Sequence, residues 1–599
     1  MSASNLHIAW ARLLVRAAAQ AGARDVIICP GSRSTPLAIA AAESDEVRCH
    51  PIVDERAAAF FALGQARVTG RPSLFVCTSG TAGAHAFPAV IEASQSFLPL
   101  IVITADRPWE LVDAAASQTI DQIKLFGAHV RHFAELGLPD PAPSALRAVA
   151  RIAAQAVARA MGPTPGPVHL NARFRKPLEP VDAPRPEPWE PAWEALMRRG
   201  GARALLPRPA IDARALDELA GRCACAERGL IVCGPAPIGD DPGRARRAIA
   251  ELARRTGFPL LAEGTSQVRF GGLSEGVVMP SAFDAFLRAP GFRAQRAPDL
   301  ILEIGAPPTS TGYAALLAEH DGCPRFVIAP HGWNDPSSTA TALIFGEPAD
   351  VCEAIEGRLP AARATAAAAS AAWAGAFARA DAIAAAAAAR AAASAPLTEG
   401  AVVREAVRAC PEGSFLAIGN SMPVRDLDTY CPPSARALGV LHQRGASGID
   451  GLVSGAAGAR SATGAPVTLV LGDLSLLHDL TGLLLAARIA AGGPPLVIVA
   501  VQNDGGRIFE HLPIASSASG PALLDRCFTM PQRLDFAPAA AMFGLAYERV
   551  DAGKALAGAL ATAHARPGAT LIEAVVPPED GAARAARLWA EVRRGIEAT

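Results

Sequence analysis

The sequence predicts an α/β protein built from three doubly wound α/β domains, each a mostly parallel sheet with helices on both faces. Two observations point to this fold class. Short apolar runs typical of buried parallel strands recur along the 599 residues, and helix-like segments lie between them. Two stretches of unusual composition then divide the chain into three blocks: a Pro-, Glu- and Trp-rich stretch ends near residue 209, and an alanine-rich stretch ends near residue 394.

The first domain is expected at residues 1–185. Its clearest strands are predicted at residues 25–29, 73–77 and 100–104. A turn of small residues, 78–83, follows the second of these strands, and a short strand near Ile52 leads into a helix with Glu55 at the junction. An acid in a first helical turn complements the helix dipole, so Glu55 considered alone does not indicate a site.

A linker is predicted at residues 186–209, where no hydrophobic period persists. The central domain follows at residues 210–360. Its strands are expected at residues 229–233, 300–304 and 325–329. Residues 361–394 are dominated by alanine, the best helix former, and are predicted as a helical linker on the surface between domains.

The third domain, residues 395–599, carries the strongest motif. Two apolar runs, 467–471 and 496–501, predict buried strands, and residues 476–490 predict one crossover helix between them. A right-handed strand–helix–strand unit brings both strand ends to the same edge of a sheet. The residues that should therefore meet are Gly472-Asp473-Leu474-Ser475 and Asn503-Asp504-Gly505. The first and third blocks look like two copies of one architecture.

These residues suit a metal–diphosphate site. The Asp473 carboxylate, the Asn503 amide oxygen and a carbonyl at Gly505 are hard oxygen donors, the kind that Mg²⁺ prefers, with Mn²⁺ as the alternative cation. Phosphate oxygens would complete the coordination, and backbone amides near Leu474 and Ser475 would face the phosphates. The sequence therefore predicts a class of cofactor as well as a fold.

Composition narrows the choice of partners and compartment. Hydrophobic residues make up 51% of the chain and the mean hydropathy is +0.23, which excludes general disorder. A formal net charge of −1 gives no reason to expect nucleic acid or an anionic membrane as partner. No uncharged apolar run reaches the roughly 18 residues of a membrane-spanning helix. With 11 irregularly spaced cysteines and no secretory signal at the start, a cytoplasmic protein is expected.

The early Glu55 beside a strand, together with the late Gly472-Asp473 and Asn503 motif, resembles the thiamine diphosphate-dependent decarboxylase superfamily across the whole chain and in domain order. The resemblance implies that the first domain binds the aminopyrimidine of the cofactor and that the third binds its diphosphate through the metal. Glu55 would then be catalytic, because a carboxylate on the pyrimidine ring nitrogen favours the tautomer whose imine nitrogen deprotonates the thiazolium. The residues implied in cofactor binding are Thr81, Gly419, Gly448, Gly472, Leu474, Ser475 and Ile449, the last as support beneath the bent cofactor.

Five longer segments resemble one family within this superfamily, the 2-succinyl-5-enolpyruvyl-6-hydroxy-3-cyclohexene-1-carboxylate (SEPHCHC) synthases of menaquinone biosynthesis. They are residues 29–37, 104–108, 419–426, 444–451 and 505–509. The resemblance implies decarboxylation of 2-oxoglutarate on thiamine diphosphate, followed by conjugate addition of the succinyl carbanion equivalent to isochorismate. The expected products are SEPHCHC and CO₂.

The arginines in these segments fit that reaction on independent grounds. Both substrates are dianions at pH 7, and the planar guanidinium fork suits carboxylates better than lysine does. The resemblance implies isochorismate contacts from Ser32, Arg33, Arg107 and Gln118. The residues it implies near the moiety derived from 2-oxoglutarate and the reacting carbons are Ser421, Arg425, Arg444, Ile508 and Phe509, the last two as an apolar wall.

Two alternatives stay open at this point. One is another thiamine diphosphate carboligase or decarboxylase of the acetolactate synthase type, although pyruvate is a monoanion and would not need four arginines. The other is a nucleotide-binding module without catalysis. Thr311 stands where the family commonly has a lysine, so no substrate contact is assigned to it. Because the superfamily pairs the pyrimidine-binding block of one subunit with the diphosphate-binding block of another, at least a homodimer is expected, and a homotetramer is compatible with the same pairing.

Overall fold

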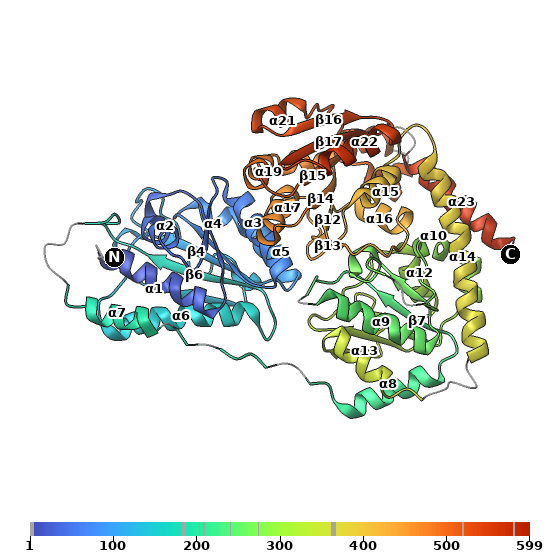
Figure 1. Cartoon of the computed structure of the whole chain (residues 1–599), viewed down its shortest axis with the longest axis horizontal. Coiled ribbons are helices and arrows are strands. Elements are labelled where there is room, and N and C mark those ends of the chain that lie inside the picture. Colours follow the sequence, from blue (N-terminus) through green and yellow to red (C-terminus); the bar gives the residue numbers. More distant parts are fainter. Residues whose placement is uncertain are drawn as a thin grey trace. The chain divides into compact units, whose positions relative to one another are not determined.

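The computed structural model describes residues 5–181, 187–199, 201–202, 204–207, 210–239, 241–272, 275–360, 367–517, 520–578 and 581–598. Helices cover three parallel β-sheets, as Figure 1 shows, so the predicted α/β class is confirmed. The chain divides into two compact units. Unit 1 comprises Met1–Arg208, Gln443–Thr463 and Asp479–Ile489, and unit 2 comprises Pro209–His442, Gly464–His478 and Ala490–Thr599.

The first sheet lies in unit 1 and has six parallel strands in the order β2-β1-β3-β4-β6-β5. The strands are β1 (Asp25–Ile28), β2 (Arg48–Pro51), β3 (Ser73–Cys77), β4 (Leu100–Asp106), β5 (His132–Glu135) and β6 (Pro167–Arg173). The helices of this domain include α1 (Leu6–Ala21), α2 (Thr35–Ala42), α3 (Glu55–Thr69), α5 (Phe87–Gln95) and α6 (Pro143–Met161). Every residue of β3, β4 and β6 is buried, as expected for parallel strands covered by helices on both faces.

A second six-stranded parallel sheet lies in unit 2 and has the order β13-β12-β14-β15-β17-β16. Its strands are β12 (Phe415–Ile418), β13 (Gly439–His442), β14 (Val467–Gly472), β15 (Leu496–Gln502), β16 (Ala546–Val550) and β17 (Ala569–Val575). Counted from its own first strand, this sheet has the same order as the first sheet, so the two blocks share one architecture, as expected. Both sheets have a topological switch point, where the strand order reverses, between the first strand and the third: β1 and β3 in one sheet, β12 and β14 in the other. The carboxyl ends of the strands at such a point are where α/β sheets bind ligands.

The central sheet, also in unit 2, has five parallel strands in the order β11-β10-β9-β7-β8. They are β7 (Gly229–Cys233), β8 (Leu260–Ala262), β9 (Leu300–Ile304), β10 (Arg325–Ala329) and β11 (Ala342–Phe345). The three strands predicted here coincide with β7, β9 and β10. Within unit 2 the central domain is tied to the third domain by the buried Arg269, whose Nη1 donates to the carbonyl oxygens of Leu427 and Cys431 at 3.1 Å each.

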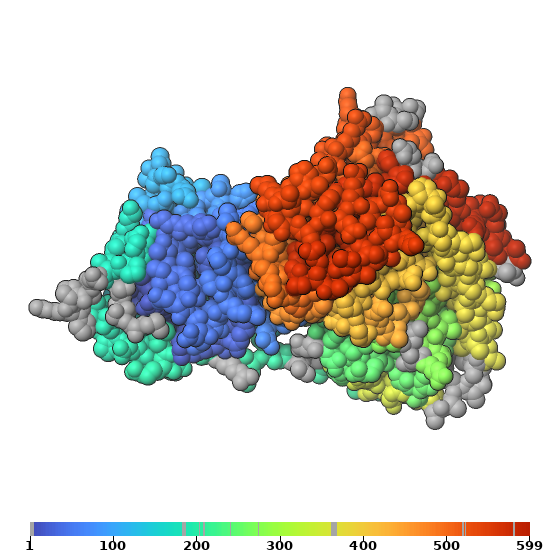
Figure 2. Space-filling view, turned by 45° about the horizontal axis from the view of Figure 1, so that its top comes forward, coloured from blue at the N-terminus to red at the C-terminus, as the bar shows by residue number. Residues whose placement is uncertain are grey.

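The alanine-rich stretch forms α14 (Ala367–Ala393), which packs against α23 (Gly581–Glu597) and is the yellow surface beside the red one in Figure 2. Trp373 Nε1 anchors α14 to the central sheet by donating to the Gly229 carbonyl oxygen at 2.9 Å. None of the described helices, α14 included, is long and apolar enough to cross a membrane. The domain borders predicted at residues 185, 209, 360 and 394 stay predictions. Residues 182–186, 200, 203, 208, 209 and 361–366, near those borders, lie outside the described ranges.

Helices α3 and α17 (Leu452–Thr463) cross at very close range within unit 1. A Cβ added to Gly64 would lie 2.0 Å from the Gly455 carbonyl oxygen, and one added to Gly458 would lie equally close to a backbone oxygen of α3. Because only glycine permits this approach, these positions let the two backbones touch. The crossing holds the helix that begins at Glu55 against a segment of the third block.

The single crossover helix predicted for residues 476–490 is wrong. The segment instead forms two short helices, α18 (Asp473–His478) and α19 (Gly482–Ala490). The break has a physical reason: the buried Asp479 carboxylate accepts hydrogen bonds from the Ser454 amide at 2.8 Å and from its hydroxyl at 2.9 Å. Ser454 lies in the first turn of α17, where backbone amides have no partner within the helix. Asp479 accepts from one of these amides, and α18 ends before it at His478.

Gly64→Ala should destabilise unit 1, because the new methyl group would occupy the 2.0 Å gap to the Gly455 oxygen. Forcing an extra methyl into a packed contact costs on the order of 1–3 kcal/mol, so the melting temperature should fall. The matched control is Gly221→Ala in α8 (Ala213–Cys225), where a Cβ meets nothing within 4 Å and alanine should stabilise the helix by up to about 1 kcal/mol. Calorimetry compares the two variants. A melting temperature that is unchanged in Gly64→Ala contradicts the close crossing.

Candidate functional site

The carboxyl edge of the third-domain sheet brings together the polar residues that follow β12, β14 and β15. These three strands are neighbours, and the register pairs Gly472 with Val501, so Asp473 and Asn503 leave the sheet at almost the same level. The Gly505 amide donates to Asp473 Oδ2 at 2.8 Å. The predicted convergence of the two motifs is therefore seen directly in the structure.

Asp473 is a buried acid at the start of α18. Its Oδ1 accepts from the Leu474 amide at 2.7 Å and its Oδ2 from the Gly505 amide. Burial, and to a smaller extent the charge of Asp504, raise the pKa of Asp473 to about 6 even though the two amides and the charge of Arg507 oppose the rise. The carboxylate is thus incompletely compensated by its protein neighbours, which is the condition that a cation would relieve.

Asn503 supplies the second donor. Its Nδ2 donates to the Glu399 carboxylate, whereas its Oδ1 is buried and has no hydrogen-bond partner in the described part of the chain. An amide oxygen buried without a partner costs about 1–3 kcal/mol. The Asp473 carboxylate, the open Asn503 amide oxygen and the Gly505 backbone carbonyl thus form the kind of hard oxygen donor set that Mg²⁺ or Mn²⁺ prefers.

The loop after β15 is fixed in shape. Gly505 has a φ of +121°, and a Cβ there would lie 2.2 Å from the Thr529 carbonyl oxygen, so only glycine fits. Arg507 donates hydrogen bonds from Nε to the Asn503 carbonyl oxygen and from Nη2 to the Asp504 carbonyl oxygen, both at 2.9 Å. No group of three or more His, Cys, Asp or Glu side chains that could hold a metal ion occurs in the described ranges.

The remaining third-domain candidates lie around the same strand ends. Gly419 follows β12, where a Cβ would lie 3.1 Å from Leu471 Cα. Ser421 has a φ of +70°, which is strained for a residue other than glycine, and its carbonyl accepts from Arg425 Nη1 at 2.6 Å. The Leu474 amide, predicted to face a phosphate, is engaged by Asp473 here, and Ser475 is buried beside it in α18.

Ile508 and Phe509 belong to the short 3₁₀ helix η5 (Arg507–His511) and are half-buried. The Phe509 ring packs on Phe528 with centroids 5.4 Å apart. The two side chains therefore sit on the same loop as the open Asn503 oxygen, where the predicted apolar wall would be required.

The first sheet gathers a second set of candidates at its carboxyl edge. Its order β2-β1-β3-β4 places the residues after these four strands along one edge. The candidates that follow them are Glu55 after β2, Ser32 and Arg33 after β1, Thr81 after β3 and Arg107 after β4. Gly31 makes the turn after β1 possible, because a Cβ there would lie 2.3 Å from the Thr78 side chain.

Arg33 and Arg107 form a positive pair on this edge. Arg33 is 5% exposed, donates Nη1 to the Phe174 carbonyl at 2.6 Å, and has a pKa lowered by burial and by the charge of Arg107. The Nε groups of both arginines are buried without a hydrogen-bond partner among the described residues. Two guanidinium groups with open donors make a site for an anion, as carboxylate recognition requires.

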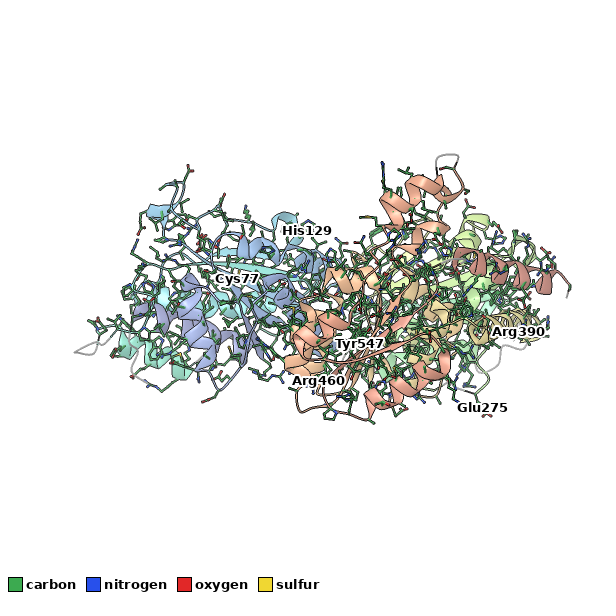
Figure 3. All side chains as sticks on the ribbon, turned by 90° about the horizontal axis from the view of Figure 1, so that it is seen from above. Cys77, His129, Glu275, Arg390, Arg460 and Tyr547 are labelled. Carbon is green, nitrogen blue, oxygen red and sulfur yellow. The ribbon has the colours of Figure 1, made fainter. Side chains whose placement is uncertain are left out.

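Glu55 begins α3 but does not cap it. The cap is Asp54, whose Oδ1 accepts from the Arg56 amide at 2.9 Å. Glu55 is half-buried and has no hydrogen-bond or ion-pair partner among the described residues. Its charge adds to burial in raising the pKa of the thiols of Cys29 and of Cys77, the second of which is labelled in Figure 3, so Glu55 lies near the ends of β1 and β3.

Gln118 lies against the turn that leads to Thr81. Its carbonyl accepts from the Ser79 hydroxyl at 2.9 Å, and its own φ is +59°. Gly80, with a φ of +90°, donates its amide to the buried Gln122 at 2.9 Å. Thr81 then starts α4 (Thr81–His85) with its side chain exposed. Polar contacts thus help to hold the turn at 78–83.

The loop that carries Arg444, Gly448 and Ile449 also belongs to unit 1. It is held by the buried Glu92, which accepts from the Gly445 amide at 3.2 Å and from the Ala446 amide at 2.7 Å. Ile449 is half-buried. Unit 1 therefore contains both Glu55 and the loop of the predicted cofactor support.

The candidates thus fall into two sets. Unit 1 holds Ser32, Arg33, Glu55, Thr81, Arg107, Gln118, Arg444, Gly448 and Ile449, and unit 2 holds Gly419, Ser421, Arg425, Gly472, Asp473, Leu474, Ser475, Asn503, Gly505, Ile508 and Phe509. Sequence reasoning missed Glu399, Glu92 and Gln122, each of which holds a candidate residue or its loop by hydrogen bonds. Nothing in the sequence signals them, because their partners lie 42 to 354 residues away.

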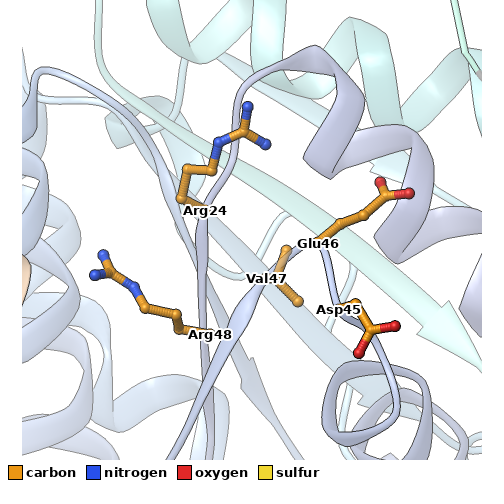
Figure 4. Close-up of a pocket in the computed structure, with 5 residues that line it drawn as sticks. All are labelled: Arg24, Asp45, Glu46, Val47 and Arg48. Atoms are coloured by element: carbon orange, nitrogen blue, oxygen red, sulfur yellow. The ribbon is translucent and has the colours of Figure 1, made fainter.

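A surface depression shown in Figure 4 lies elsewhere. It is lined by Arg24, Asp45, Glu46, Val47 and Arg48. These residues stand at the amino ends of β1 and β2, the opposite ends of those strands from Arg33 and Glu55. Arg48 pairs with Asp25 at 2.9 Å and Glu46 with Arg16 at 2.7 Å. Two of the four charged lining residues are thus already paired, and the depression lies away from every candidate residue, so it is not a candidate site.

Comparison with known proteins bears on both sets. Residues 8–125 match the family model described as thiamine pyrophosphate enzyme, N-terminal TPP binding domain. A SEPHCHC synthase of Sorangium cellulosum is 72% identical over 599 residues, which cover 100% of this chain and 97% of that protein. This chain belongs to the SEPHCHC synthase family. It is therefore a thiamine diphosphate-dependent enzyme, which sets aside the non-catalytic module and the acetolactate synthase type.

More distant members agree with this placement. SEPHCHC synthases of Geobacillus kaustophilus and Haloarcula marismortui are 40% and 39% identical, with 89% and 92% of each chain covered. Among solved structures, benzoylformate decarboxylase from Polynucleobacter necessarius has a TM-score of 0.68 at 16% identity, covering 95% of this chain and 99% of that one. A putative thiamin diphosphate-dependent enzyme from Mycobacterium smegmatis has the same TM-score and coverage at 20% identity. At these identities the structures show the shared fold.

Thr481, two residues after the buried Asp479, links the start of α3 to the break before α19. Thr481 Oγ1 donates to Asp54 Oδ2 at 2.7 Å, next to Glu55. Burial raises the pKa of Asp479 from its ordinary 3.8 to about 6, while the Ser454 hydrogen bonds and the Arg56 charge oppose the rise. The folded state therefore holds this proton more tightly than the unfolded state does. The stability that Asp479 contributes is fully present below pH 4 and is lost as the pH rises through about 6.

Asp479→Asn should remove this pH dependence. At 1.36 kcal/mol per unit of pKa shift, the wild-type free energy of unfolding should lose up to about 3 kcal/mol between pH 4 and pH 6 relative to the variant. Urea unfolding of both proteins at several pH values measures the difference. Asp140→Asn, at an exposed residue of the same domain, is the control and should give a constant offset. A constant offset for Asp479→Asn as well would contradict the burial argument.

Proposed function

We propose that this enzyme decarboxylates 2-oxoglutarate and adds the resulting four-carbon unit to isochorismate, giving SEPHCHC and CO₂ in menaquinone biosynthesis. The observation that carries the proposal is the 72% identity over the whole chain to a SEPHCHC synthase. The two substrates are dianions, and the arginine-rich first-sheet edge supports their recognition. The divalent cation is proposed as Mg²⁺, with Mn²⁺ as the alternative.

The proposed metal ligands are the Asp473 carboxylate, Asn503 Oδ1 and the Gly505 carbonyl. The incompletely compensated Asp473 and the open Asn503 oxygen support the assignment, because both would gain from a cation: the two amides on Asp473 do not offset its burial, and Asn503 Oδ1 has no hydrogen-bond partner among the described residues. The Gly505 carbonyl accepts from the Arg507 amide at 2.9 Å and keeps a second lone pair for the metal. The diphosphate would be held through this cation, beside Gly419, Gly472, Leu474 and Ser475.

Thiamine diphosphate, when bound, supplies the carbon nucleophile that takes up a 2-oxo acid and allows CO₂ to leave. Glu55 is proposed to hold and return a proton at the pyrimidine ring nitrogen. The absence of a side-chain partner for Glu55 among the described residues and its place on the carboxyl edge support this role. Gly448 and Ile449 are proposed to support the cofactor, and the turn at Thr81 to lie against its ring.

The substrate contacts are proposed from charge and shape. Arg33 and Arg107, with Ser32 and Gln118, would take the carboxylates of isochorismate, because their guanidinium groups keep open donors at a common strand edge. The residues proposed for the part derived from 2-oxoglutarate are Ser421, Arg425 and Arg444. Ile508 and Phe509 would exclude water near the reacting carbons, where low polarity favours loss of CO₂ from a charged adduct.

A homodimer is proposed as the smallest active unit, and a homotetramer would satisfy the same pairing of blocks between subunits. A cytoplasmic location is proposed as well. It is supported by the eleven cysteines, which all lie in the described ranges and none of which forms a disulfide, since a reducing compartment keeps thiols reduced.

The purified protein with thiamine diphosphate and Mg²⁺ should consume isochorismate only when 2-oxoglutarate is also present. Both acids are required because one supplies the four-carbon unit and the other accepts it. The loss of isochorismate absorbance and the release of CO₂ measure the reaction, with pyruvate in place of 2-oxoglutarate as the control. Isochorismate that stays unchanged with both acids present, or equal consumption with pyruvate, contradicts the proposal.

Glu55→Gln should lose nearly all turnover, roughly 10²- to 10⁴-fold, because the amide cannot exchange the proton at the pyrimidine nitrogen. Glu43→Gln is the matched control, since Glu43 is an exposed acid of the same domain paired with Arg12. Melting temperature and cofactor content should match the wild type in both variants. Turnover of Glu55→Gln within a few-fold of wild type would remove Glu55 from the mechanism.

A further inference from the structure

We infer that Glu399 is a positioning residue: it orients the Asn503 amide so that the oxygen, not the nitrogen, faces the divalent cation. The inference rests on the proposed function, because it concerns the metal site named there. It assigns a role to a residue that lies 104 positions from its partner and outside every motif of the sequence.

The contact itself carries the argument. Glu399 Oε1 accepts a hydrogen bond from Asn503 Nδ2, and Glu399 is half-buried. A carboxylate oxygen can accept a hydrogen bond but has no proton to give to an amide oxygen. The nitrogen side of the amide is therefore bound to Glu399, and Oδ1 points the other way, where the described residues offer it no partner.

An asparagine needs this help because the two ends of its amide have nearly the same shape. Exchanging oxygen and nitrogen changes only which end donates and which accepts. With the nitrogen toward the cation, the positive amide hydrogens would repel it and one ligand would be lost. The backbone of Asn503 is already fixed by Arg507 Nε at 2.9 Å, so the side-chain torsion is the freedom that Glu399 removes.

Glu399 is itself held in place. It is the first residue of α15 (Glu399–Ala409), and the cap residue Thr398 accepts from the Ala401 amide at 3.2 Å. The next residue, Gly400, packs so tightly on Tyr430 that a Cβ would lie 2.3 Å from the tyrosine ring. The start of α15 thus cannot shift without breaking a cap and a close contact, and a rigid neighbour is what a metal ligand requires.

The test compares Glu399→Met, which keeps the volume but loses the acceptor, with Glu399→Gln, which keeps an acceptor oxygen. Titration with Mn²⁺ in the presence of thiamine diphosphate, followed by the electron paramagnetic resonance of free Mn²⁺, gives the cation affinity. Glu399→Met should bind Mn²⁺ about 10- to 100-fold more weakly, the usual effect of losing a residue that orients a ligand. Glu399→Gln should stay within a few-fold of wild type. Glu405→Met, on the same helix at a surface pair with Arg408, is the control and should not change the affinity.

Wild-type affinity in Glu399→Met overturns the inference. So does equal loss in Glu399→Gln, because the charge rather than the orientation would then matter. If Glu399→Met does not fold, Glu399→Ala takes its place with the same expectation, and failure of both to fold shows a purely structural role and also overturns it. Asp473→Ala separates this result from the proposed function. If Asp473→Ala binds Mn²⁺ as tightly as the wild type, the proposed metal site is wrong. If Asp473→Ala loses Mn²⁺ binding while Glu399→Met binds normally, only the role of Glu399 is wrong.

Discussion

The hydrogen bond between the Gly505 amide and the Asp473 carboxylate is the contact on which the third-domain site depends. It joins the ends of two neighbouring parallel strands, and it forms because the register of β14 and β15 brings both ends to one level. The Asp473 carboxylate still lacks full charge compensation, because its two amide hydrogen bonds do not offset its burial and its pKa stays raised. Beside it the Asn503 oxygen is buried without a partner in the described chain. The proposed cation would resolve both deficits at once.

The two six-stranded sheets have the same strand order but carry opposite chemistry at their carboxyl edges. The third-domain edge offers oxygen acceptors, which are proposed to hold a cation and through it a diphosphate. The first-domain edge offers guanidinium donors at Arg33 and Arg107, which are proposed to hold carboxylates, and one acid, Glu55, that has no side-chain partner among the described residues. One architecture used twice would therefore supply the two kinds of recognition that a charged cofactor and dianionic substrates need.

The sequence predicts the parallel strands well, because a strand buried on both faces is a continuous apolar run. β3, β7, β9 and β10 begin and end where they were expected. The meeting of Asp473 with the loop at Asn503 also follows from topology alone. The crossover helix was wrong because the break at Asp479 is made by Ser454, a tertiary partner that no local pattern reveals. Glu399 and Glu92 were not predicted for the same reason, since each hydrogen-bonds to a loop more than 100 residues away in the sequence.

The most direct test of the account is an experimental structure of the protein with thiamine diphosphate and Mn²⁺, with the metal located by its anomalous scattering. The account predicts the metal peak at the Asp473 carboxylate, Asn503 Oδ1 and the Gly505 carbonyl, with the Glu55 carboxylate on the pyrimidine ring nitrogen. A metal peak away from this strand edge, or a Glu55 side chain that does not contact the ring, would contradict it.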